Sequence, residues 1–244
     1  MCMNKKISIV TVSYNAVATI ESTILSVINQ TYSNVEYIII DGGSTDGTVD
    51  IIKKYQDKIS YWISEPDQGI YDAMNKGLKI ASGEWINFMN SGDSFVHTEV
   101  LENLQLEQYD RRIVALYGDT IYVRPRGEEL LKSRLPNFLL RNMPTSHQSF
   151  FVRTENAKMI GFDVKYKYDA DYNMMYQLLG KYGMQSIKYL PQTIARYDVC
   201  IGLTISHRNA VFREVLRIRK FDLWWIWDFM KYIILMLCPY FVKK

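Results

Sequence analysis

The chain reads Val35-Glu-Tyr-Ile-Ile-Ile-Asp-Gly-Gly-Ser-Thr-Asp46 in its first third, a nearly continuous apolar run followed at once by a polar, glycine-containing turn. A strand with one face in water alternates apolar and polar residues, so the run from Val35 to Ile40 is expected to be a strand buried on both faces. Its end at Asp41 is abrupt, and the polar turn is expected to lie at the edge of a sheet.

Strand and helix patterns alternate on both sides of this segment. Working outward along the first hundred residues, we expect strands at 7–12, 35–40, 59–63 and 85–89, and helices at 18–29, 46–55 and 70–81. Asp46 is a plausible N-cap of the second helix. Strands separated by helices of this length indicate βαβ units, so the sequence predicts an α/β fold with a mostly parallel central sheet.

The second half of the chain is less regular. We expect strands at 113–116, 149–152 and 188–197, a helix at 171–179, and a basic stretch that contains Arg124, Arg126, Lys132 and Arg134. We find neither a Pro/Gly/Ser-rich linker nor an internal repeat. Residues 1–205 are therefore expected to form one compact domain, with a regular half at 1–95 and a less regular half at 96–205, followed by an appendage at 206–244.

The appendage combines a basic helix with an aromatic and apolar run from Leu223 to Val242. This run approaches the ~20 residues that span a bilayer, but Asp228, Lys231 and Pro239 interrupt it. Tryptophans at one end and basic flanks favour an amphipathic helix on a membrane surface. Packing into the core or a homodimer interface, and a true membrane span, are the alternatives.

Composition excludes several classes of protein. The 244 residues are 48% hydrophobic with a net charge of +3, which excludes intrinsic disorder and gives no support for nucleic-acid binding. Three widely separated cysteines form neither a disulfide framework nor a paired metal motif. No secretory signal is visible, so we expect a cytoplasmic protein.

Three polar clusters follow strands of the predicted parallel sheet: 11–15, 41–46 and 90–93. The carboxyl ends of such strands meet at one edge, where α/β proteins bind their ligands. Asp41 and Asp93 supply carboxylates there, which suit a divalent cation or a nucleotide. Neither a GxGxxG turn after the first strand nor a GxxxxGK[ST] loop is present, so a nucleotide would have to be bound through side chains and a metal.

Several segments, in order, resemble the family 2 glycosyltransferases, in particular the bacterial subset that builds colanic-acid-like and other surface polysaccharides. They are Ile7-Ser-Ile-Val-Thr-Val-Ser-Tyr-Asn15, Gln30-Thr31, Ile39-Ile-Asp-Gly-Gly-Ser-Thr-Asp46, Glu65-Pro-Asp-Gln-Gly-Ile-Tyr-Asp-Ala-Met-Asn-Lys-Gly77, Ala81-Ser-Gly-Glu-Trp85 and Met89-Asn-Ser-Gly-Asp93. The resemblance implies a GT-A fold, an inverting mechanism and a nucleotide-diphosphate sugar donor, usually linked to UDP.

The resemblance also implies roles for individual residues on the donor side. The nucleotide-sugar would be bound by Thr11, Ser13, Tyr14, Asp41, Asp67, Asn75, Asn90 and Ser91, with Asp41 at the base and Asn90 near the ribose; packing is the alternative role for Asn75. Asp93 would hold a Mn²⁺ or Mg²⁺ ion that bridges the two phosphates. Many family members read Asp-Ala-Asp-Asp where this chain reads Asn90-Ser91-Gly92-Asp93, so one carboxylate stands in place of three.

On the acceptor side, Asp169-Ala-Asp171-Tyr172 resembles the family's Glu-Asp pair followed by an aromatic residue. On that match Asp171 is the catalytic base that deprotonates the acceptor hydroxyl, and a helix N-cap is the alternative role for either aspartate. His147 would ligate the metal, contact the diphosphate or orient the acceptor, or else have a purely structural role. His207 and Arg208 are candidates to close over the diphosphate.

We therefore expect a metal-dependent inverting glycosyltransferase that acts on a lipid-linked glycan at the cytoplasmic face of the membrane. A sugar-nucleotide nucleotidyltransferase is a first alternative, although such enzymes usually need a Gly-rich basic loop that residues 11–16 lack. A non-catalytic binding or scaffolding subunit is a second alternative, prompted by the reduced acidic motif.

Overall fold

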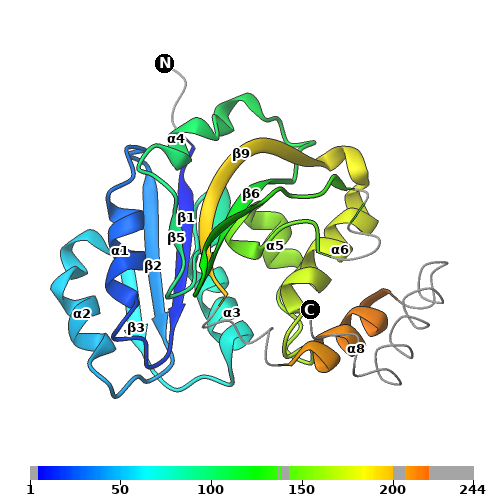
Figure 1. The fold of residues 1–244 in the computed structure, drawn as a ribbon. Helices are drawn as coiled ribbons and strands as arrows, with labels where there is room; N and C mark the ends of the chain where they lie inside the picture. Colours follow the sequence, from blue (N-terminus) through cyan, green and yellow to red (C-terminus); the bar gives the residue numbers. More distant parts are fainter. Residues whose placement is uncertain (1–4, 137, 139–142, 200–206, 220–244) are drawn as a thin grey trace.

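A computed structural model describes residues 5–136, 138, 143–199 and 207–219 (Figure 1). The strands are β1 (Ile7–Ser13), β2 (Val35–Asp41), β3 (Tyr61–Ser64), β4 (Trp85–Phe88), β5 (Ser94–Phe95), β6 (Ala115–Arg124), β7 (Gly127–Leu131), β8 (Phe150–Arg153) and β9 (Ile187–Asp198). The α-helices are α1 (Ile20–Ile28), α2 (Thr48–Lys54), α3 (Ile70–Ile80), α4 (Val100–Asn103), α5 (Thr154–Ile160), α6 (Ala170–Tyr182) and α8 (Arg208–Arg219). Short 3-10 helices include η4 (His147–Ser149), which directly precedes β8.

The strands form one nine-stranded sheet in the order β3-β2-β1-β4-β8-β6-β9-β5, with β7 paired to β6. The strands β3, β2, β1 and β4 are parallel to one another, as the alternation of strands and helices in the sequence predicts. The second half joins through β8, which runs antiparallel to both β4 and β6. The predicted α/β architecture with helices on both faces is confirmed (Figure 1).

Strand β2 is buried on both faces, in agreement with its apolar sequence. Ile38, Ile39 and Ile40 all have 0% exposed surface. Ile38 and Ile40 belong to the core under α3 and α6, whereas Ile39 belongs to the core under α1. Because successive side chains of a strand point to opposite faces, β2 contributes to two separate hydrophobic cores, one on each face of the sheet.

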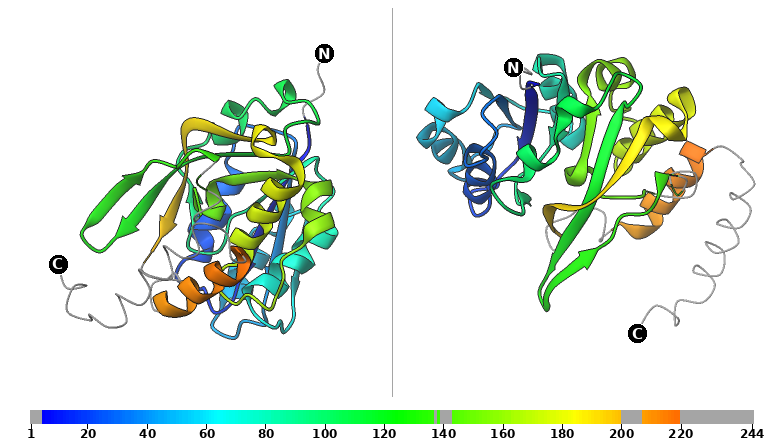
Figure 2. Two further views of the ribbon diagram at one scale, coloured as in Figure 1. Left: turned by 90° about the vertical axis from the view of Figure 1, so that its right-hand side faces the viewer. Right: turned by 90° about the horizontal axis from the view of Figure 1, so that it is seen from above.

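The structure differs from the sequence-based expectation in two local respects. Gly47, not Asp46, immediately precedes α2; it has a φ of +103°, in the left-handed region that favours glycine. The Asp46 carboxylate still accepts the Thr48 N–H at 3.0 Å. The basic stretch in the second half forms part of a β6–β7 hairpin that projects from the sheet (Figure 2).

Helix α8 begins the segment that the sequence assigns to a C-terminal appendage, and it packs on the protein. Val215 and Ile218 are 5% and 4% exposed and lie in the same core as residues of α6. The residues on which a membrane-surface helix depends, 220–244, lie outside the described residues. Within the described ranges, no helix has the length and apolar character needed to span a bilayer.

Candidate active site

The carboxyl ends of the parallel strands bring the predicted polar clusters together. Ser13, the last residue of β1, is in register with Asp41, the last residue of β2. Asn90 follows β4, which pairs with β1 on its other side. The loop after β4 is fixed to β1 because the Ser91 N–H donates to the Val12 carbonyl at 3.1 Å. The three predicted polar clusters therefore lie at one edge of the sheet.

Asp41 organises the loop that follows β2. It is fully buried, and its two carboxylate oxygens accept five hydrogen bonds: from the hydroxyls of Ser13, Ser44 and Ser64 and from the backbone N–H groups of Gly43 and Ser44. Burial would raise the pKa of Asp41, but these hydrogen bonds outweigh it and hold the pKa below its ordinary value. A contact between this carboxylate and a nucleobase would have to displace one of the five donors.

The Asp67 carboxylate and the Tyr14 ring lie on either side of Gly42 in this loop. Gly42 must lack a side chain, because a Cβ at this position would collide with the Asp67 carboxylate and lie 3.4 Å from the Tyr14 ring. Tyr14 is 66% exposed, so its ring is available to a ligand. Asp67 is held by the Gly69 N–H, which donates to its Oδ1 at 2.8 Å. An exposed ring next to an oriented carboxylate suits a planar group that carries hydrogen-bond donors.

Two other predicted donor-site residues have protein partners. Thr11 is fully buried and donates to the Met89 carbonyl at 2.8 Å, so it lies beneath the surface of the site. Asn75 uses both amide atoms on Phe162: its Nδ2 donates to the carbonyl at 2.8 Å and its Oδ1 accepts the N–H at 2.9 Å. This is the packing role that the helical position of Asn75 also allows.

Asp93 is buried in the loop after β4, with 5% exposed surface. The Gln148 amide donates to its Oδ2 at 2.5 Å, and the Asp198 N–H donates to its Oδ1 at 3.2 Å. Burial raises the pKa of Asp93 to about 7, although the Gln148 hydrogen bond opposes the shift. The carboxylate therefore gains its charge near neutral pH, in a position where a cation would strongly favour the charged form.

The side chains around Asp93 fit a hard cation. Asn90 Oδ1 and Gln148 Oε1 are buried oxygens that receive no hydrogen bond from any described residue. Together with the Asp93 carboxylate they supply the neutral and charged oxygen ligands that Mg²⁺ and Mn²⁺ accept. In the part of the chain that the structure describes, no group of three or more His, Cys, Asp or Glu side chains is placed to hold a metal. A cation here would depend on one carboxylate, amide oxygens and the phosphates of a ligand.

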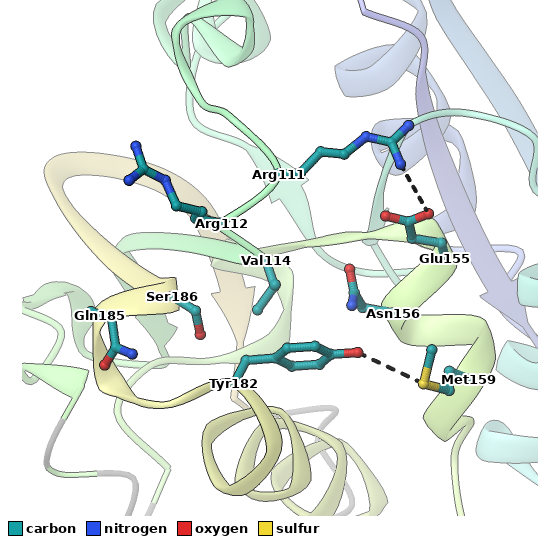
Figure 3. Close-up of a pocket in the computed structure, with 9 residues that line it drawn as sticks. All are labelled: Arg111, Arg112, Val114, Glu155, Asn156, Met159, Tyr182, Gln185 and Ser186. Carbon is teal, nitrogen blue, oxygen red and sulfur yellow. Dashed lines mark hydrogen bonds and ion pairs between the residues drawn. The ribbon is translucent and has the colours of Figure 1, made fainter.

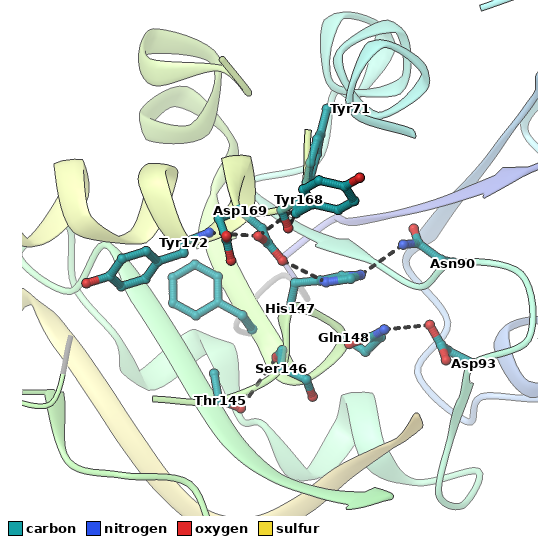
Figure 4. Close-up of polar contacts among 12 residues, drawn as sticks. Tyr71, Asn90, Asp93, Thr145, Ser146, His147, Gln148, Tyr168, Asp169 and Tyr172 are labelled. Atoms are coloured by element: carbon teal, nitrogen blue, oxygen red, sulfur yellow. Dashed lines mark hydrogen bonds and ion pairs between the residues drawn. The ribbon is translucent and has the colours of Figure 1, made fainter. Parts of the chain in front are cut away.

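His147 connects this loop to the predicted base (Figure 4). Its Nδ1 lies 3.0 Å from Asp171 Oδ2, and its Nε2 lies 2.9 Å from Asn90 Nδ2. An ionised carboxylate cannot donate, so His147 carries its proton on Nδ1, donates it to Asp171, and accepts from the Asn90 amide at Nε2. The imidazole thus joins the donor side and the acceptor side of the site.

Asp171 lies in the first turn of α6 and is 7% exposed. Its Oδ1 accepts hydrogen bonds from the Tyr71 hydroxyl at 3.0 Å and from the Tyr172 N–H at 2.8 Å. Burial, followed by the negative charge of Asp171, raises the pKa of Tyr71 well above its ordinary value, so the phenol remains a donor. The His147 ring and the Tyr172 N–H therefore hold the Asp171 carboxylate, and the single Tyr71 hydroxyl proton is shared between this carboxylate and the Tyr168 carbonyl, 2.7 Å from the hydroxyl.

Asp169 immediately precedes α6, but its side chain is not part of the hydrogen-bond pattern of the helix. It is 6% exposed, and its Oδ2 receives no hydrogen bond within the described ranges. Burial, followed by the charges of Asp171 and Glu214, raises the pKa of Asp169 to about 8. Near neutral pH it is therefore mainly the uncharged acid.

Two residues of this network were not predicted from the sequence. Gln148 and Tyr71 lie inside segments that resemble the family, next to His147 and within the Glu65–Gly77 block. Each could have been proposed from its neighbours in the motif, but their contacts join positions 55 and 100 residues apart. Local patterning carries no signal for such contacts.

A separate cavity of about 580 Å³ lies near the start of β6 (Figure 3). Val114, Asn156 and Tyr182 contribute to its wall, and none of the predicted site residues lines it. Strand β6 is antiparallel to β8, so Val114 lies at the opposite end of the sheet from His147. The cavity is not part of the polar edge described above.

Comparison with known proteins agrees with this arrangement. The family model described as glycosyl transferase family 2 matches residues 8–166, more than half of the chain. The chain belongs to glycosyl transferase family 2. The match covers the strand ends at Ser13 and Asp41, the loop with Asp93 and the segment with His147.

Curated relatives are named as glycosyltransferases. An uncharacterized glycosyltransferase of Mycobacterium tuberculosis is 33% identical over 171 residues, which cover 68% of this chain and 65% of that protein. The chain thus aligns with slightly less than two thirds of that relative. A PGL/p-HBAD biosynthesis glycosyltransferase of Mycobacterium bovis is 27% identical over 229 residues, covering 86% of this chain and 82% of the relative.

Solved structures share the fold. The S. aureus TarS fragment in complex with UDP superposes with a TM-score of 0.68 at 21% identity, covering 88% of this chain and 64% of that one. The mannosyltransferase PcManGT of Pyrobaculum calidifontis, in complex with GDP-Man and Mn²⁺, superposes with a TM-score of 0.69 at 16% identity. This match covers 99% of this chain and 76% of that one. The fold is therefore that of the GT-A glycosyltransferases of family 2.

Proposed function

We propose that this family 2 glycosyltransferase moves a sugar from a nucleotide-diphosphate donor, with UDP the first candidate, to an acceptor hydroxyl with inversion at the anomeric carbon. One observation carries the proposal: His147 hydrogen-bonds both Asp171 and Asn90, so the candidate base is joined to the loop that also carries Asp93. A base on one side and a diphosphate site on the other are what an in-line displacement requires.

The donor would occupy the edge formed by the ends of β1, β2 and β4. Related structures were determined with UDP, with UDP-GlcNAc and with GDP-Man and Mn²⁺. In our proposal Tyr14 and Asp67 contact the nucleoside directly, and Asn90 and Ser91 approach the ribose. Thr11, Ser13, Asp41 and Asn75 would act mainly by fixing the loops that surround the donor.

Asp93 would hold the divalent cation, with Asn90 Oδ1 and Gln148 Oε1 as candidate supporting oxygens. When bound, Mn²⁺ or Mg²⁺ neutralises charge that develops on the departing diphosphate. The Gln148 hydrogen bond orients the Asp93 carboxylate from the acceptor half. Ionisation of Asp93 near pH 7 and binding of a cation would therefore be coupled.

The transfer step follows from the position of Asp171. The acceptor oxygen forms a bond to the anomeric carbon, the bond from that carbon to the diphosphate oxygen breaks, and the acceptor proton passes to Asp171. His147 and Tyr71 contact the carboxylate before the step, which keeps it oriented. General base catalysis of this kind contributes about 10²- to 10⁴-fold.

The acceptor would be a lipid-linked glycan of surface polysaccharide biosynthesis. Support comes from the resemblance of the sequence motifs and from the basic and aromatic residues of 220–244, which suit attachment to the inner face of a membrane. A homodimer through the apolar residues of the same segment is the alternative.

Calorimetric binding of UDP, GDP, dTDP and CMP, each with Mn²⁺ and with a chelator, tests the donor site. We expect one nucleotide to bind selectively, Mn²⁺ to strengthen binding, and Asp93→Asn to abolish the Mn²⁺ effect. Asp50→Asn, on the exposed surface of α2, is the matched control. Absence of binding under every condition would contradict the proposal and favour a non-catalytic role.

A further inference from the structure

Glu214, on α8, accepts three successive backbone hydrogen bonds from the turn before α6. Its Oε1 accepts the Lys167 N–H at 2.9 Å, and its Oε2 accepts the N–H groups of Tyr168 and Asp169 at 2.9 and 3.1 Å. These contacts span 45 to 47 positions in the sequence. One carboxylate thus fixes the path of three consecutive residues.

The environment of Glu214 makes these bonds strong and specific. The residue is 8% exposed, and its neighbour Val215 is buried in the core shared with α6. At the start of α8, the His207 ring stacks on Tyr168 with centroids 4.9 Å apart. A buried carboxylate must be fully hydrogen-bonded to be tolerated, and here the turn supplies the donors.

The turn held by Glu214 leads directly to the candidate base. Asp169 immediately precedes α6, and Asp171 lies two residues further along. The carbonyl of Tyr168 also accepts the Tyr71 hydroxyl at 2.7 Å, and the same hydroxyl lies 3.0 Å from Asp171 Oδ1. A shift of the turn would therefore move both the backbone that carries Asp171 and the phenol that orients it.

The side chain of Asp169 does not provide this support. Its Oδ2 has no hydrogen-bond donor among the residues described, whereas its backbone N–H is bound by Glu214. The position of the first turn of α6 is consequently specified from α8, an element outside the matched family segment at 8–166.

We infer that Glu214 is a positioning residue for Asp171, acting through the backbone of Lys167–Asp169, so that α8 sets the geometry of the candidate base. The inference rests on the proposed transferase function. It predicts a defect in turnover without a defect in donor binding, because Glu214 contacts the acceptor half alone in the hydrogen bonds described. A residue with a merely structural role would lower the free energy of unfolding and leave both kcat and KM of the folded protein at their wild-type values.

Glu214→Gln provides the test, because the amide keeps the shape of the side chain but replaces one acceptor oxygen with a donor. Arg217→Gln, at an exposed position of the same helix, is the control. Nucleotide release from UDP-glucose, UDP-N-acetylglucosamine and GDP-mannose with Mn²⁺ first identifies a donor that the full-length wild type uses. For that donor we expect kcat of Glu214→Gln to fall about 10- to 100-fold with an unchanged KM.

Hydrogen exchange supplies a second readout that does not depend on activity. The amides of Lys167, Tyr168 and Asp169 should exchange slowly in the wild type and faster in Glu214→Gln, with no change in Arg217→Gln. Should Glu214→Gln not fold, unprotected amides in the wild type alone would still overturn the inference. Wild-type kcat and KM in a folded Glu214→Gln would overturn it as well, while a wild type that turns over no donor would contradict the proposed function instead.

Discussion

Asp171→Asn is the substitution that most directly separates chemistry from structure in this site. The amide has nearly the same shape as the carboxylate but cannot take a proton from an acceptor hydroxyl. In the wild type Asp171 accepts from His147 Nδ1 at 3.0 Å, from the Tyr71 hydroxyl at 3.0 Å and from the Tyr172 N–H at 2.8 Å. An asparagine keeps an oxygen for the last two donors and turns its NH₂ group toward His147.

The network can accommodate this change by reversing its direction. His147 would move its proton from Nδ1 to Nε2, and the Asn90 amide would turn so that Oδ1 accepts from Nε2. Asn90 Oδ1 receives no hydrogen bond from the described part of the wild-type chain, so the reversal satisfies an atom that was unpaired. We therefore expect the free energy of unfolding to change by no more than about 1 kcal/mol.

Catalysis should respond much more strongly than stability. Loss of a general base costs about 10²- to 10⁴-fold in kcat, equivalent to about 2.7–5.5 kcal/mol of transition-state stabilisation. Nucleotide binding without a metal should be unchanged, because Tyr14 and Asp67 lie outside this hydrogen-bond chain. Only the Mn²⁺ effect on binding should weaken, because the turned Asn90 amide no longer offers Oδ1 to a cation. The fall should thus appear in kcat, with the nucleotide Kd measured in chelator within about twofold of wild type.

The assay is steady-state turnover of the donor that the wild type uses, with calorimetric nucleotide binding and urea unfolding on the same samples. Asp163→Asn, which removes a carboxylate paired with Lys165 on the surface, is the control. Retention of more than a tenth of wild-type kcat in a folded Asp171→Asn that binds nucleotide normally would refute the assignment of Asp171 as the base.

Three further predictions concern stability and are measured by urea unfolding. The raised pKa values of Asp169 and Asp93 mean that the folded state keeps two protons that the unfolded state releases, so wild-type stability should decline as the pH rises from about 4, through about pH 7 for Asp93 and about pH 8 for Asp169. Each group contributes up to about 1.4 kcal/mol per pH unit, and Asp169→Asn should remove its share of the slope while that of Asp93 remains. Gly77→Ala should lower the free energy of unfolding by about 1–2 kcal/mol although alanine favours a helix, because the new methyl group would collide with Val10 Cγ1 and lie 3.3 Å from Cγ2. In a Val10→Ala background, the same Gly77→Ala change should lose most of this cost. Arg153→Met should lower the free energy of unfolding by about 1–3 kcal/mol because buried Arg153 donates to three backbone carbonyls and pairs with the partly exposed Glu84. An unchanged free energy of unfolding would contradict this reading.

Much of the fold could be predicted from local pattern. The apolar run before Asp41 predicts a strand buried on both faces, and all three isoleucines of that run are fully buried. Alternation with helices predicts parallel pairing of the first strands, which places their polar ends at one edge. These inferences succeed because hydrophobic periodicity reports burial directly.

The pattern could not give the direction of individual side chains or their distant partners. Thr11 belongs to the expected polar cluster but donates to Met89 beneath the surface. From the sequence, Glu214 would be taken for a solvent-exposed charge on a basic helix. In the structure it is buried and accepts hydrogen bonds from a turn more than 40 residues away. Such contacts depend on how α8 packs against the core, a property of the whole fold that local sequence does not encode.

The two hydrogen bonds that hold Asp93 have a consequence for how this enzyme can be divided. Gln148 and the backbone of Asp198 belong to the second half of the chain, yet they fix the carboxylate proposed for the donor's metal. A fragment ending at residue 95 would leave that carboxylate without its two donors. Chimaeras that exchange acceptor halves between relatives should therefore keep the His147-Gln148 pair together with the donor half, because the functional boundary does not coincide with a boundary in the sequence.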